Sequence, residues 1–198
     1  MLEKYSIKFK VNKINNLKKG LDVLNSTNNY TNFEADKKAV MDYSFNFVLK
    51  LMNSGSSLLD MFKVNMEPQI QELGEEILAD KENVKNQEAL NKALNDEEPL
   101  NNIQKDIYGT NEAKEAVNEK VRKRNILIND YKNPREGLKN YLLEKFMPIM
   151  YLNLDLGELA DAIIDNDINY FNNHKEEIAN IDSTIFADIY SDIYSEEY

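Results

Sequence analysis

The stretch AVMDYSFNFVLKLM, residues 39–52, is apolar on nearly its whole circumference when its residues are placed on a helix. Two neighbouring rows at helical spacing contain Val40, Ser44, Phe47 and Leu51, and Met41, Phe45, Val48 and Met52. Such a helix leaves no face for water, so other elements must surround it. Thr31 and Glu34 have the spacing of a capping box, which predicts a helix that begins there and ends near Asn53.

The N-terminal residues 4–12, KYSIKFKVN, alternate between apolar and polar side chains. Strict alternation is typical of a half-buried β-strand, and lysines on its outer face are typical of an exposed sheet edge. We therefore expect a short N-terminal β-strand, with Lys8 and Lys10 able to contact a protein partner. A short helix, weakened by Gly20, should follow, with apolar side chains at Ile14, Leu17, Leu21 and Leu24.

Residues 67–99 are acidic and poor in aromatics, and their thin apolar stripes predict loosely packed surface helices with flexible joints. Thr110 should cap a longer helix that runs to about Tyr131. Asn133 and Pro134 mark a new helix start, because proline suits the first helical position.

Two further signals lie in the C-terminal region. Pro148 should end or kink the preceding helix, and the pair Asp155 and Glu158 should form a capping box for the next one. The fold class that follows is mainly α, an irregular multi-helix domain with a short N-terminal β-strand element. We expect residues 1–132 and 133–198 to be two regions of one continuous domain.

The net charge is −11, and its sign alternates along the chain. Residues 1–50 and 101–150 carry a basic excess, whereas the last 48 residues hold 12 acidic side chains and one basic side chain. An acidic balance disfavours direct binding to nucleic acid, because a binder needs positive charge for the phosphates. Alternating blocks favour contacts between segments, or between subunits, in which unlike charges attract.

Several site types are disfavoured by composition alone. The chain has no cysteine and a single histidine, His174, which leaves no thiolate or histidine-rich metal site. Its six glycines are scattered singly and form no phosphate-binding loop, and we expect no cofactor. It contains no apolar run of membrane-spanning length, and charges interrupt the segment where a signal peptide would need an apolar stretch. We expect a soluble, non-membrane protein of a bacterial or host cytoplasm, or of a virion.

The segment DNDINYFNNHKE, residues 165–176, has oxygen-bearing side chains at the spacing of an EF-hand calcium loop. The four candidate ligands are Asp165, Asp167, Asn169 and Glu176. However, Tyr170 stands where the sharp turn of that loop needs glycine. A polar connection between two helices is the favoured interpretation, and calcium is the alternative.

The basic cluster KVRKR, residues 120–124, spreads around more than half of a helix, so it does not form one compact anion site. We expect Lys120, Arg122 and Arg124 to pair with the acidic C-terminal third, within or between subunits. Adjacent carboxylates such as Glu75 and Glu76 point in different directions on a helix, which argues against a shared catalytic role. We identify no catalytic residue.

The C-terminal stretch TIFADIYSDIYSEEY, residues 184–198, repeats its aromatic and aliphatic residues every four positions. On a helix, one row contains Phe186, Tyr190, Tyr194 and Tyr198, and its neighbour contains Ile185, Ile189 and Ile193. The stretch also alternates as a strand would, but we favour an amphipathic helix. These residues must pack, either on their own domain or on a partner.

The sequence therefore favours a non-enzymatic protein-interaction or assembly subunit that contacts copies of itself or other proteins. Its 28 asparagines and few arginines are typical of an AT-rich genome, which suggests a structural or assembly protein of a phage. The alternative is an acidic inhibitor or immunity-type protein that blocks a basic partner, in which carboxylates imitate nucleic acid.

Overall fold

The computed structural model describes residues 2–27, 30–52, 57–97 and 109–194. Within those ranges every regular element is helical, which confirms the mainly α class. The chain divides into two compact units, the first formed by Met1–Phe62 and Arg135–Tyr198 and the second by Lys63–Pro134.

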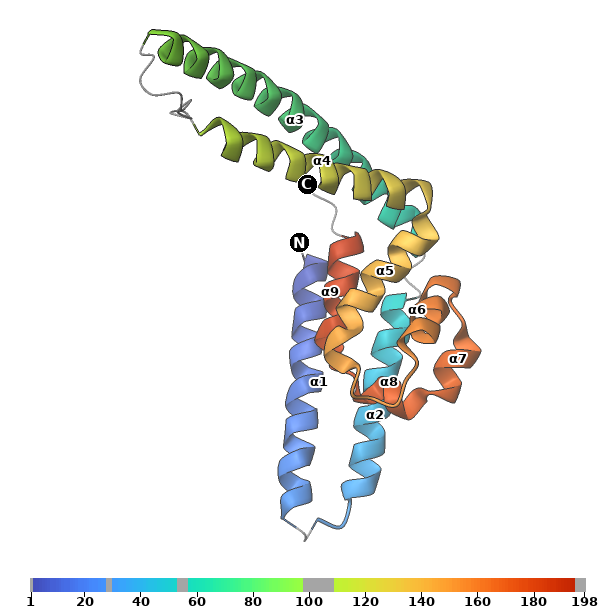
Figure 1. Cartoon of the computed structure of the whole chain (residues 1–198). Coiled ribbons are helices and arrows are strands. Elements are labelled where there is room, and N and C mark those ends of the chain that lie inside the picture. The colour runs from blue at the N-terminus through green and yellow to red at the C-terminus, as the bar shows by residue number, and fades with distance from the viewer. Residues whose placement is uncertain (1, 28–29, 53–56, 98–108, 195–198) are drawn as a thin grey trace. The chain divides into compact units, whose positions relative to one another are not determined.

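The first unit contains the helices at both ends of the chain (Figure 1). They are α1 (Leu2–Ser26), α2 (Phe33–Met52), the start of α3 (Leu58–Glu97), α5 (Pro134–Phe146), the 3-10 turn η1 (Met147–Ile149), α6 (Leu156–Asp165), α7 (Ile168–Asn173), α8 (Lys175–Asn180) and α9 (Ser183–Tyr194). The second unit contains the rest of α3 and α4 (Thr110–Lys132).

The predicted N-terminal strand is wrong, because its residues belong to the 25-residue helix α1. Ile7, Val11 and Ile14 are spaced by four and three residues, so a helix places them on one face. Val11 and Ile14 are buried there, and Ile7 packs against the same core. Phe9, which the strand would have buried with them, is 70% exposed. A helical stripe and a short alternation coincide in this segment, and burial against the core favours the helix.

The prediction that α2 lies at the centre of the core agrees with its contacts. It packs against α1, α8 and α9, and its second half is buried on several sides. Small side chains meet at the contact with α9, where the Ser44 and Ser183 hydroxyls, both fully buried, lie 3.4 Å apart. Large aromatics complete the core, with Phe146 and Phe186 rings 6.1 Å apart between centroids.

Helix ends in the C-terminal region follow their sequence signals. Pro134 is the first residue of α5, and α5 gives way to the 3-10 turn that contains Pro148. Asp155 caps α6, because its carboxylate accepts hydrogen bonds from the backbone N–H groups of Gly157 at 2.8 Å and Glu158 at 3.0 Å.

The second unit is a helical hairpin with a polar seam. Contacts between Glu67 and Tyr131 near one end, and between Asn91 and Thr110 near the other, show that α3 and α4 run antiparallel. The loosely jointed surface helices expected over residues 67–99 are instead one helix that continues through Pro68 to Glu97. Each helix of this unit has a buried apolar residue, Ile77 on α3 and Val117 on α4.

We predict that Phe186→Ala destabilises the first unit by about 3–5 kcal/mol, because it removes a fully buried ring and leaves a cavity. Met150→Ala is the control, since Met150 is 66% exposed and its truncation should change the unfolding free energy by less than about 0.5 kcal/mol. Chemical denaturation followed by circular dichroism measures both. Equal effects of the two variants would contradict the described core.

Candidate functional site

An open apolar groove lies between α1 and α2 in the first unit, with a volume of about 550 Å³. Most of its lining is aliphatic, aromatic or small. The lining residues are Lys13, Asn16, Leu17, Gly20, Leu21, Leu24, Asp36, Ala39, Val40 and Tyr43. Leu17 and Tyr43 remain 41% and 38% exposed at its surface, so apolar area that could be buried faces solvent.

The groove exists because α8 and α9 cover only part of the α1–α2 hairpin. Lys18 on α1 donates a hydrogen bond to the Ile181 carbonyl at 2.9 Å, at the point where α9 is about to begin. On α2, Ser44 contacts Ser183, the first residue of α9. Figure 1 shows that the halves of α1 and α2 nearest their connection extend beyond α8 and α9.

A second hollow of about 350 Å³ continues the groove along the outside of α1. It shares Lys13, Asn16 and Leu17 with the groove and adds Asn12 and the exposed ring of Phe9. The two hollows therefore form one apolar surface that follows α1. Contiguous exposed apolar surface of this kind is typical of interaction sites.

The groove carries one cation and one anion among its lining side chains. The Lys13 ammonium lies 5.6 Å from the centroid of the Tyr43 ring, a cation–π geometry. Asp36 accepts a hydrogen bond from the Tyr30 hydroxyl, which raises the pKa of Tyr30 because the bond favours the protonated phenol. No carboxylate of the described residues lies within ion-pair distance of Lys13.

The predicted C-terminal helix is present as α9, and it packs on its own unit. Phe186, Ile189 and Ile193 are buried in the core, while the partly buried Ile185, Tyr190 and Tyr194 pack around them. Tyr198 lies outside the described residues. The open alternative between packing within the chain and packing on a partner is answered, for the described part of the helix, by contacts with α1 and α2.

Two hydrogen bonds to one carboxylate of α9 join that helix to α5. Asp192 accepts hydrogen bonds from the Tyr141 hydroxyl and the Lys145 ammonium, both at 2.7 Å. Burial raises the pKa of Tyr141 strongly, and the hydrogen bond to Asp192 adds to the rise. The phenol therefore stays protonated and serves as a structural donor.

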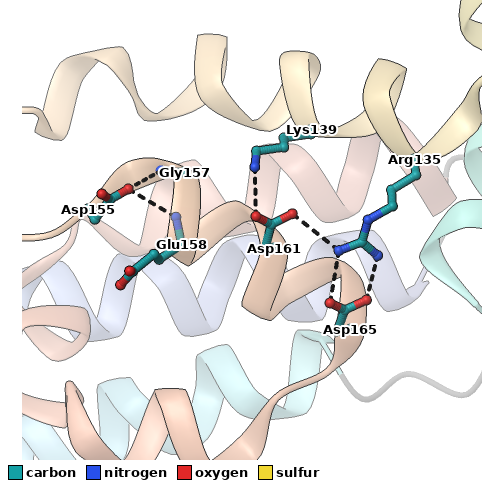
Figure 2. A network of polar contacts seen from close by, with 7 residues as sticks. All are labelled: Arg135, Lys139, Asp155, Gly157, Glu158, Asp161 and Asp165. Carbon is teal, nitrogen blue, oxygen red and sulfur yellow. Dashed lines mark hydrogen bonds and ion pairs between the residues drawn. The ribbon is translucent and has the colours of Figure 1, made fainter.

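The four candidate calcium ligands do not form a metal site. In Figure 2 the carboxylate of Asp165 points to Arg135, which it binds through both oxygens at 2.5 and 2.9 Å. Asp167 caps α7 by accepting from the backbone N–H groups of Asn169 and Tyr170, and Glu176 lies in the first turn of α8. The described residues contain no group of three or more acidic or histidine side chains able to hold a metal ion.

Figure 2 shows what the acidic side of α6 does instead. Arg135 and Lys139, one turn apart on α5, face Asp165 and Asp161, one turn apart on α6. Asp161 joins both basic groups, at 3.2 Å from the Arg135 guanidinium and 2.6 Å from the Lys139 ammonium. This ladder fixes the register of two helices and leaves these carboxylates paired.

The basic cluster of α4 pairs with α3, within the second unit. Lys120 lies 2.8 Å from Glu76 and 2.7 Å from Asp80, and hydrogen bonds to Asp80 and then Glu76 raise its pKa to about 12. Arg124 donates to the Ile70 carbonyl at 3.1 Å. Arg122 is exposed. The expected pairing of the cluster with the C-terminal third is therefore replaced, for Lys120, by pairing with the acidic residues of α3.

Gly74 explains how Arg124 reaches the backbone of α3. A Cβ at Gly74 would lie 3.2 Å from the Arg124 Nε atom, closer than most such contacts. The missing side chain therefore leaves room for the guanidinium against the helix. Lys8 and Lys10, which we expected to contact a protein partner, both lie on α1. Lys8 is exposed and Lys10 is half-buried.

Sequence reasoning missed the groove because it assigned part of α1 to a strand and took Gly20 only as a weak point in a helix. The signal was present in the apolar spacing of Leu17, Leu21 and Leu24 around that glycine.

None of the helices in the described ranges has an apolar run that could span a bilayer. No family model, curated protein or solved structure matches the chain.

We predict that Arg135→Gln reduces the loss of stability that acid causes. The Arg135 guanidinium holds the pKa of Asp165 below its ordinary 3.8, mainly by hydrogen bonding, with burial opposing the shift. A carboxyl group whose pKa is lower in the folded than in the unfolded protein stabilises the fold at pH values above its ordinary pKa. This stabilisation is lost as the pH falls through the lowered pKa. The variant should be less stable than the wild type at neutral pH, and the difference should shrink below about pH 4.

Urea denaturation at a series of pH values measures this difference. Lys19→Gln is the matched control, because it removes a positive charge from an exposed site on α1. If both variants show the same pH dependence, net charge and not the contact with Asp165 is the cause.

Proposed function

We propose that the protein is a non-enzymatic assembly subunit that binds copies of itself and, through such contacts, takes part in a larger protein complex. The observation that carries this proposal is the apolar groove of the α1–α2 hairpin. Its lining offers aliphatic and aromatic contact area, with Lys13 and Asp36 as its two charged residues. That chemistry suits binding to an apolar surface of another protein.

The position of the groove adds support. Leu17 and Val40 line the groove on facing helices, and Leu17 is still 41% exposed even though Lys18 beside it contacts the Ile181 carbonyl. Two helices alone enclose little apolar area, whereas four helices can enclose a core. A further helix or helix pair from another chain would supply the missing cover.

The acidic-inhibitor alternative has less support. It requires free carboxylates in the C-terminal region that could imitate phosphates. Asp161, Asp165 and Asp192 are instead held by basic groups of the same chain, so they also serve the fold. The many asparagines and few arginines are still the reason for proposing a phage origin, but they add nothing to the argument from the groove.

We predict that multi-angle light scattering of the full chain gives a mass above that of the monomer as protein concentration rises. Raising the salt concentration should not abolish the association, because apolar contacts resist salt and screening also weakens the repulsion between copies of net charge −11. A monomer at every protein and salt concentration would count against the assembly role.

A further inference from the structure

The features of the α1–α2 groove match one half of a twofold-symmetric interface. We propose that a second copy of this chain closes the groove, so that two α1–α2 hairpins pack antiparallel as a four-helix bundle. This inference rests on the assembly role proposed above, and it adds the partner, the surface and the orientation.

Gly20 is the first observation that points to an occupant. Glycine in a helix interior is unfavourable relative to alanine, so a reason for its presence is needed. A Cβ added at Gly20 would meet no atom of this chain within 4 Å, so packing inside the chain does not require the glycine. The open space lies in the wall of the groove, where it can receive a side chain of another molecule.

The two charges of the groove are the second observation. Lys13 lies beside the ring of Tyr43, and Asp36 precedes Tyr43 by about two helical turns, or roughly 10 Å along α2. The cation and the anion therefore lie at different levels of the groove. A twofold axis between those levels reverses the second hairpin, which places Lys13 of each copy opposite Asp36 of the other.

This arrangement selects a second copy over an unrelated helix. An unrelated partner would need an acid and a base of its own at matching levels, whereas symmetry supplies both from the same two residues. The axis passes close to Leu17, which is partly exposed at the centre of the groove. Identical leucines would then meet at the axis and fill the hollow.

The dimensions predict a dissociable dimer. From Lys13 to Leu24 the groove follows α1 for about 16 Å, which is the length of roughly three turns. An interface of this length lies at the small end of specific protein contacts, and we expect a dissociation constant in roughly the micromolar range.

Charge exchange tests the orientation. Lys13→Glu alone should weaken the dimer at least about tenfold, because two carboxylates then face each other at each contact with Asp36, and Asp36→Lys alone should do the same with two ammonium groups. An equimolar mixture of the two variants should associate about as tightly as the wild type. In a dimer of one variant with the other, each of the two contacts again joins a carboxylate to an ammonium group. Sedimentation equilibrium measures the four dissociation constants, those of the wild type, the two variants and their mixture. A mixture no tighter than either variant alone would overturn the antiparallel arrangement.

Substitution of Gly20 tests the close approach. Gly20→Met should raise the thermal unfolding midpoint of the dilute monomer by about 2–4 °C, because methionine favours the helix and the chain leaves room for it. The same change should weaken the dimer at least about tenfold by filling the space meant for the second copy. A stabilised monomer with undiminished association would overturn the proposed interface.

Leu17→Asp locates the interface, and Leu78→Asp is its matched control. Both replace a partly or largely exposed leucine on a helix, but Leu78 lies on α3 in the second unit. The first should abolish association and the second should leave it unchanged. An oligomer that Leu17→Asp does not alter would overturn this inference and leave the assembly role standing, whereas a wild-type monomer at all concentrations would overturn both.

Discussion

The second half of α2 must be covered on several sides, and the rest of the first unit follows from this constraint. Val48 and Phe45 face different neighbours, and both are almost completely buried. No single helix can cover such an element, so the chain supplies α1 before it and α8 and α9 from the far end of the sequence. The C-terminal helix is therefore part of the core, and its apolar rows are explained by contacts within the chain.

The same constraint explains where the first unit is incomplete. The buried rows belong to the second half of α2, while the first half carries one buried apolar residue, Val40, among charged and small neighbours. Cover by α8 and α9 therefore stops near Ser44, and α1 remains the neighbour of α2 beyond that point. The groove therefore lies beside the first half of α2, which has α1 as its neighbour, and ends where the second half, which contacts several helices, begins.

Much of this fold could be predicted from local patterns, because the sequence of α2, the fourfold repeat of α9 and the cap at Asp155 all favour helices there. Failure began where two periods coincided: Ile7 and Val11 fit both a strand and a helix, and Ile14 decides only when a longer window is considered. The continuous helix α3 could not be predicted because its stripe needs α4, whose register depends on tertiary contacts. The groove was missed for a related reason, since an open space is a property of several elements together.

The alternating charge blocks acquire a different meaning once their partners are known. Arg135 and Lys139 pair with the acidic side of α6, and Lys120 pairs with α3, so unlike blocks meet inside each unit. These pairs are partly exposed to solvent, so each adds little to stability. Because internal pairing accounts for much of the pattern, charge blocks alone are poor evidence for assembly. The groove is better evidence, since its apolar lining and its unneeded glycine have no comparable use within the described chain.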